Sequence, residues 1–172
     1  AALGLMERGV ARGVVSFDVR RKGPWHRIWP GDRLDAGGVT VRAFRSTDAG
    51  VSFLVEVGGI SVFHAGDLNF WHWRGESTEA EVREARRAFD RAITEIEGNP
   101  VDIAFFPVDP RMGEGHDEGA LEFAARVRPG VIFPMHFWDR PEAARAFCHK
   151  PMPEGVRAPC LTVPGESFHW TS

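Results

Sequence analysis

The chain of 172 residues has few cysteines, no long apolar run and no block of basic residues. Its two cysteines, Cys148 and Cys160, lack the CxxC spacing of metal and redox motifs. Two free thiols in a reducing cytoplasm are therefore expected, with a single disulfide as the alternative. No apolar stretch reaches the about 20 residues of a membrane span, and no signal peptide is visible. These absences predict a cytoplasmic protein with no membrane partner.

Common catalytic signatures are missing as well. The sequence has no Gly-rich phosphate loop, no GxSxG nucleophile elbow and no Cys–His nucleophile pair. The net charge of −3 comes from interspersed charges of both signs, which argues against a nucleic-acid partner. With 43% hydrophobic and 26% charged residues and no internal repeat, residues 1–172 are expected to form one soluble globular domain.

The apolar pattern predicts hairpin strands first and alternating helices and strands afterwards. Gly58-Gly59 fits a two-residue hairpin turn, and Thr78 with Glu81 forms a capping box that begins a helix ended at Gly98. Residues 20–38 are expected to be a loop. This order of elements predicts an α/β layered domain. The expected elements are a helix end at 1–12, strands at 14–19, 39–44, 51–57, 60–65, 101–108 and 131–135, helices at 78–97, 117–127 and 141–148, and terminal strands at 161–163 and 167–170.

Polar residues follow several of the predicted strands. Asp48, Asp67, Asp109 and His136 each come just after a strand. Because ligands gather at strand ends in layered α/β sheets, these side chains are expected to converge. Asp67 lies in the stretch 63–73, where a Gly-Asp turn is followed by His and Trp residues. That stretch is either the wall of a site or a turn acid in front of a buried aromatic cluster.

Asp67 and His136 form the best candidate pair for chemistry. A carboxylate and a neutral imidazole suit zinc, iron or manganese. Each residue ends an apolar strand, where a bare polar group needs a partner. Taken singly, each is more often a capping or hydrogen-bonding residue than a metal ligand. Asp48, in an ordinary polar turn, is a weak third candidate.

Four further residues are candidates for the surroundings of the site. Asp109 and Arg111 could position a substrate or orient a metal ligand, with a plain Asp-Pro turn and a surface Arg as an equal alternative. Trp71 and Trp138 could line an aromatic-walled substrate pocket. His64, by contrast, is expected to point away from the side that its strand neighbours face, because side chains alternate along a strand.

Four sequence blocks occur in an order that is typical of one protein family. The blocks are STDAGVSFLVE at 46–56, FHAGDLN at 63–69, FFPVDPR at 105–111 and FPMHFWD at 133–139. With them the sequence resembles the metallo-β-lactamase-fold hydrolases, and among these a branch of small bacterial proteins similar to the ascorbate-phosphate lactonases. The resemblance covers about residues 13–150. Any one block alone would not be specific, whereas the ordered set is.

The resemblance implies a four-layer αββα sandwich with a metal site at one edge between two β-sheets. It also implies that Asp67 bridges two metals and that His136 is the last ligand of the second metal. One or two divalent metal ions are therefore expected as cofactors, zinc first, with manganese or iron as alternatives. A metal-bound hydroxide would attack an ester, lactone, amide or phosphoester bond of a small-molecule substrate.

One departure from the family is large. The family's main metal motif, HxHxDH, precedes the position of Asp67, and no HxHxDH occurs in this sequence. Catalytic zinc sites usually have three protein ligands, whereas this chain offers Asp67, His136 and the doubtful Asp48. The sandwich is therefore expected to be incomplete at the N-terminus. The chain alone is expected to be inactive, with its metal absent in that case.

An incomplete sandwich has a structural consequence. Without its opening strands, one sheet would leave an edge and an apolar face uncovered. An upstream segment, or a second copy of the chain in a homo-oligomer, would cover that face. The alternative to a hydrolase is then a non-catalytic remnant of the fold that binds a ligand or dimerises.

Overall fold

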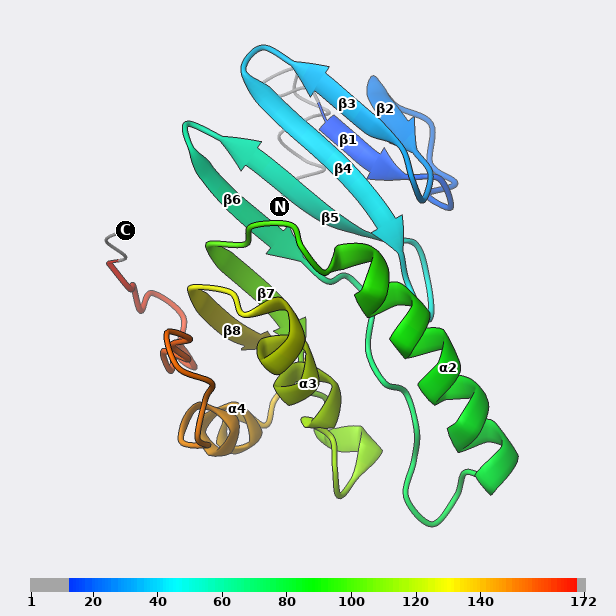
Figure 1. Ribbon diagram of the computed structural model, residues 1–172, viewed down its shortest axis with the longest axis vertical. Helices are drawn as coiled ribbons and strands as arrows, with labels where there is room; N and C mark the ends of the chain where they lie inside the picture. The colour runs from blue at the N-terminus through cyan, green and yellow to red at the C-terminus, as the bar shows by residue number, and fades with distance from the viewer. Residues whose placement is uncertain (1–12, 170–172) are drawn as a thin grey trace.

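The computed structural model describes residues 13–169 and contains two β-sheets and three α-helices in that range (Figure 1). The helix end expected at residues 1–12 lies outside the described residues, as does Trp170. Strands β1 (Gly13–Ser16) and β2 (Trp25–Ile28) pair in parallel as a small sheet. None of the described helices is both long and apolar enough to cross a bilayer.

The larger sheet has six strands in sequential order. Its first four strands are antiparallel neighbours, whereas β6, β7 and β8 run parallel. The carboxyl ends of these last three strands therefore meet at one edge of the sheet. The strands are β3 (Arg33–Ala36), β4 (Val39–Arg45), β5 (Val51–Val57), β6 (Ile60–His64), β7 (Ile103–Pro107) and β8 (Val131–Met135).

Two Gly-Gly turns build the antiparallel part of the sheet. Gly58 and Gly59, with φ of 58° and 80°, connect β5 to β6, which confirms the predicted two-residue hairpin. Gly37 and Gly38, with φ of 60° and 83°, make the same connection between β3 and β4. Positive φ at both central residues gives a turn whose twist matches that of the flanking strands, and glycine adopts it without steric cost.

The helices begin and end close to where the sequence predicts them. Helix α2 (Glu79–Ile96) starts at Thr78, whose side chain accepts a hydrogen bond from the Glu81 amide, while the Glu81 carboxylate accepts one from the Thr78 amide. This confirms the capping box. Helix α3 covers Glu118–Val127 and α4 covers Pro141–Cys148, with Pro141 in its first turn.

All three helices cover the same face of the six-stranded sheet. Phe89 of α2, Phe123 of α3 and Phe147 of α4 belong to one buried cluster that also contains strand residues. Phe123 stacks on Phe63 of β6, with ring centroids 5.1 Å apart, and lies 4.7 Å from Phe106 of β7. Figure 1 shows α2 and α3 in front of the sheet. The alternation of side chains along β6 and β7 produces this layer.

The opposite face of the sheet is covered only in part. A second buried cluster, Ile28 with Val41, Ala43 and Val51, lies where β2 packs against β4 and β5. Farther along, Val57 at the end of β5 and Ile60 at the start of β6 remain exposed. The predicted α/β class is confirmed, and among the described residues the helices form a layer on one face only.

Two expectations about local structure are wrong. Residues 20–38 are not a loop throughout, because β2 and β3 form there through pairing with β1 and β4, and these long-range partners cannot be recognised from a four-residue pattern. The terminal strands expected at 161–163 and 167–170 do not occur in residues 161–169. The amides of Thr162 and Val163 instead donate to the Glu166 carboxylate, which closes a turn.

Candidate functional site

The carboxyl edge of the parallel strands brings the predicted strand-end residues together. Asp67 follows β6, Asp109 follows β7, and His136 follows β8. Their register places the ends of the three strands side by side: His64 pairs with Phe105, and Pro107 pairs with Met135. The expectation that these acids and His136 converge is therefore confirmed for Asp67, Asp109 and His136.

Asp67 and His136 face each other across this edge. The Nε2 atom of His136 lies 3.3 Å from Oδ1 of Asp67, and both side chains are partly exposed. Gly66 makes the turn that directs Asp67 there: its φ is 58°, and a Cβ at this position would lie 2.9 Å from the Val51 carbonyl oxygen. Glycine is therefore required for β6 to end this close to β5.

Asp109 is a buried carboxylate next to the Asp67–His136 pair. Its carboxylate is fully buried and accepts hydrogen bonds from the Arg111 side chain, with Nε 2.9 Å from Oδ1, and from the Arg111 amide. The Trp138 indole donates to Oδ2 at 3.3 Å. Burial alone would raise the pKa of Asp109, but these hydrogen bonds outweigh it and hold the pKa below its ordinary value of 3.8. The buried group is therefore a carboxylate.

His136 lies next to this carboxylate in a strained backbone. Its Nδ1 atom is 3.9 Å from Oδ2 of Asp109, too far for a hydrogen bond, and has no other partner within residues 13–169. His136 and Trp138 have φ of 64° and 51°, which non-glycine residues seldom adopt. Such strain persists only where the surroundings impose it, and it concentrates at functional sites.

His64 is the residue that sequence reasoning set aside. It points away from the helix layer, as predicted, but this is the side on which His136 lies. The pKa of His64 is lowered from 6.5, first because the surrounding protein displaces water from the ring, although the residue as a whole is exposed. The charge of His136 lowers this pKa further, whereas the charge of Asp67 opposes the shift. Nδ1 of His64 accepts a hydrogen bond from the Gly66 amide. The sequence has no signal that places His64 near the candidate site, because this follows only from which side of the sheet the site occupies.

The aromatic residues around Asp67 divide into two groups. Trp71 donates a hydrogen bond from Nε1 to the Asp67 carbonyl at 2.8 Å, and its ring lies 6.3 Å from that of His136. Trp71 therefore lies beside Asp67 and His136, and its role in lining a substrate pocket stays a prediction. His72 instead lies buried under Phe70, with Nε2 3.5 Å from Glu118 of α3. His72 belongs to the helix layer.

Asp48 is placed in an exposed turn between β4 and β5. Its neighbour Thr47 is bonded through its hydroxyl to the backbone of Asn69, which holds the turn next to the loop that carries Asp67. No group of three or more His, Cys, Asp or Glu residues able to hold a metal occurs within residues 13–169. Asp48 as a third ligand thus stays a prediction.

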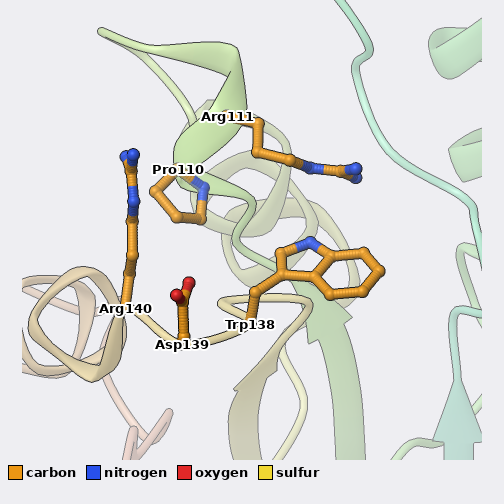
Figure 2. Close-up of a pocket in the computed structure, with 5 residues that line it drawn as sticks. All are labelled: Pro110, Arg111, Trp138, Asp139 and Arg140. Atoms are coloured by element: carbon orange, nitrogen blue, oxygen red, sulfur yellow. The ribbon is translucent and has the colours of Figure 1, made fainter.

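An open pocket of about 460 Å³ lies between the turn that follows β7 and the segment that leads into α4. Figure 2 shows its lining, in which the guanidinium groups of Arg111 and Arg140 lie on opposite sides of Pro110. Arg111 lies 4.6 Å above the ring of Trp138, which is 63% exposed. Trp138 is therefore fixed by Arg111 and Asp109 while most of its surface faces solvent.

The chemistry of Asp67 and His136 fits a divalent metal ion. A carboxylate oxygen and an imidazole nitrogen 3.3 Å apart are donor types that zinc, iron and manganese accept. The Asp109 carboxylate lies 3.9 Å from the other nitrogen of His136, where its charge favours a proton on that nitrogen rather than on Nε2. Two ligands are fewer than the three of an ordinary catalytic zinc site, so within residues 13–169 this pair does not by itself make up such a site.

Solved structures place this domain in a known fold class. It superposes on the metallo-β-lactamase fold protein YhfI from Bacillus subtilis with a TM-score of 0.56, at 14% identity over 92% of this chain and 66% of that one. A Parabacteroides distasonis protein, provisionally named a metal-dependent hydrolase, gives 0.55 at 16% identity over 85% and 62% of the two chains. These similarities show a metallo-β-lactamase fold.

The family model of the beta-lactamase superfamily domain matches residues 2–137, so the chain belongs to this family. It is also 27% identical over 132 residues to a UPF0173 metal-dependent hydrolase from Heliobacterium modesticaldum. That match covers 76% of this chain and 49% of the relative, so the chain spans about half the length of the curated relative it matches.

Proposed function

We propose that the whole protein is a metal-dependent hydrolase and that Asp67 and His136 are two of its metal ligands. The observation that carries the proposal is the 3.3 Å approach of the Asp67 carboxylate to the His136 imidazole at the carboxyl edge of three parallel strands. The name of the Heliobacterium relative, a metal-dependent hydrolase, supports the same chemistry. The other metal ligands would come from further residues of the whole protein.

The residues of this chain have distinct roles in such a reaction. A divalent ion at this edge would supply Lewis acidity toward water and the scissile bond. Asp67 and His136 would hold it, and the Asp109 carboxylate, 3.9 Å from Nδ1 of His136, would favour a proton on that nitrogen and leave Nε2 as the metal-binding atom. Arg111 keeps Asp109 ionised and in place.

The substrate proposed is a small molecule with an ester, lactone, amide or phosphoester bond, and zinc is the metal proposed first. The rings of Trp71 and Trp138 both lie near that of His136, with centroids 6.3 and 6.2 Å from its own. They would exclude water from a bound substrate and pack against its apolar part. The net charge of −3 supports a small substrate over a nucleic acid.

The test is an activity panel on the full gene product and, in parallel, on the chain of 172 residues, each loaded with zinc, manganese or iron. Chromogenic ester, lactone, amide and phosphodiester substrates cover the proposed bonds. Asp67→Asn and His136→Ala are expected to lower activity about 100-fold or more. Asp35→Asn and His149→Ala, exposed residues remote from the edge, are matched controls. Equal activity of metal-free protein, or of all four variants, would contradict the proposal.

A second candidate is a non-catalytic domain that binds a ligand or dimerises. It is favoured by one observation: residues 13–169 contain no group of three potential metal ligands. Metal analysis separates the two candidates. If the gene product retains one or two metals per chain after dialysis and hydrolyses a substrate of the panel, the second candidate is excluded. A gene product that binds no metal but forms a stable dimer or retains a ligand would favour it.

A further inference from the structure

Cys148 and Cys160 come together where the segment after α4 returns to the end of that helix. Cys148 is the last residue of α4, and its sulfur lies 3.6 Å from the carbonyl oxygen of Pro159. Because Pro159 directly precedes Cys160 in the chain, the Cys148 sulfur lies beside the Cys160 backbone. We propose that these two thiols form a reversible intramolecular disulfide that fastens residues 149–160 to α4 and to the outer edge of β8.

The two thiols differ in exposure, which assigns their roles. Cys160 is exposed, whereas Cys148 is partly buried against the helix-covered core. Burial, followed by the hydrogen bond with the Cys160 thiol, raises the pKa of Cys148 to about 12. Cys160 is therefore the thiol that reacts first with an oxidant, and Cys148 is the thiol that completes the bridge.

The oxidation balances with a small-molecule disulfide as the oxidant. The Cys160 thiolate attacks one sulfur of that disulfide and expels the other as a thiolate. The Cys148 thiolate then attacks the Cys160 sulfur of the mixed disulfide and expels the second small thiolate. The protons lost by the two cysteines end on the two departing thiols. One sulfur–sulfur bond breaks in the oxidant and one forms in the protein.

The segment closed by the bridge protects the edge of the sheet. Strand β8 is the last strand of the larger sheet. Within residues 13–169 its outer side pairs through a single bridge, between Val131 and Arg157. The Ile132 amide donates to the Arg157 carbonyl at 2.8 Å, and the Arg157 amide donates to the Gly130 carbonyl at 3.1 Å. Val156 beside it is buried. A disulfide would keep this cover closed over an edge that could otherwise pair with another chain.

The experiment equilibrates the protein with glutathione and glutathione disulfide, alkylates the remaining thiols and measures the intact mass and a peptide map. We expect wild-type protein to lose two hydrogens without a glutathione adduct and to give one peptide pair linked through Cys148 and Cys160. Its melting temperature should rise by roughly 5 °C or more on oxidation, because the bridge closes a short loop in the unfolded chain.

Two single variants complete the test. Cys148→Ser should carry glutathione on Cys160, while Cys160→Ser should carry none on the shielded Cys148, and neither melting temperature should rise on oxidation. Cys160 is exposed, so Cys160→Ser remains informative if replacement of Cys148 disturbs the core. A wild-type adduct on Cys160 with Cys148 still open to alkylation, or a disulfide only between two chains, would overturn the proposal. Hydrolase activity enters none of these measurements.

Discussion

The helix-covered face of the sheet and the carboxyl edge of its parallel strands are built on different principles. Behind α2, α3 and α4, aromatic rings fill the space between the layers, and a capping box begins α2. At the edge, His136 and Trp138 have left-handed backbones, and a buried nitrogen of His136 has no hydrogen-bond partner within residues 13–169. The first region meets the requirements of stability, and the second departs from them where its side chains could bind a metal.

The difference separates residues that maintain the fold from residues that provide chemistry. Removing a ring behind the helices leaves a cavity, whereas removing Asp67 or His136 takes away partly exposed side chains. Removing a side chain behind the helices should therefore lower the free energy of unfolding, whereas removing Asp67 or His136 should affect metal binding more than stability. Asp109 lies on the boundary, because it is fully buried yet contacts the edge.

The largest effect is expected from Phe123→Ala in α3. The ring is fully buried between Phe63 and Phe106, so its loss should lower the free energy of unfolding by about 3–5 kcal/mol. Urea unfolding followed by circular dichroism measures this. Phe17→Ala is the matched control, because Phe17 is partly exposed and should cost about 1 kcal/mol or less. Similar losses for both variants would remove the distinction between the covered layer and the surface.

Asp109→Asn should lower stability by about 2 kcal/mol at neutral pH, since it weakens a buried, charge-assisted set of hydrogen bonds. The folded pKa of Asp109 lies below the unfolded value of 3.8, so its stabilisation is complete above that value and is lost as the pH falls through the folded pKa. Unfolding curves from pH 7 to pH 3 should show wild type and variant converging in acid. A constant difference across that range would refute this role for the ionised carboxylate.

Thr78→Ala should lower stability by about 1 kcal/mol, because it removes the side-chain cap at the start of α2. Glu81→Gln is its control: glutamine can still reach back to the Thr78 amide, so the loss should be smaller. Thermal melts of the two variants measure the contrast. Equal losses would mean that the charge of Glu81, and not the capping geometry, stabilises the helix start.

The smallest effect is a reversal of the preference between alanine and glycine. His136→Gly should be more stable than His136→Ala by about 0.5–1 kcal/mol, because glycine adopts a φ of 64° without strain. At the exposed helical position Arg87, the alanine variant should be more stable than the glycine variant by about 1 kcal/mol. Unfolding free energies of the four variants decide; the same order at both positions would mean that the edge is not strained.

Much of this architecture could be predicted from local patterns. Gly58-Gly59, the capping box at Thr78 and Pro141 each encode a boundary within a few residues, and β5, β8 and α4 have the predicted bounds. Strands β2 and β3 could not be predicted, because they are only four residues long and depend on partners elsewhere in the fold. Local signals do not report such pairing.

The candidate site was predictable in its strand-end residues and not in its detail. Asp67, Asp109 and His136 follow apolar strands, and the parallel pairing of β6, β7 and β8 brings them together. Nothing in the sequence indicates that His136 and Trp138 adopt positive φ, because tertiary contacts impose those angles on residues that do not favour them. His64 was assigned to the correct side of its strand, but the position of the site relative to that side is a property of the whole sheet.

The central claim is that Asp67 and His136 bind a metal ion together, and the most direct measurement is a manganese titration followed by NMR. Paramagnetic broadening reports proximity to the ion even when binding is weak. We predict that signals from Asp67, His136 and their neighbours broaden first, that zinc competes for the same place, and that Asp67→Asn abolishes the effect. Broadening that begins elsewhere, or that is unchanged in Asp67→Asn, would contradict the claim.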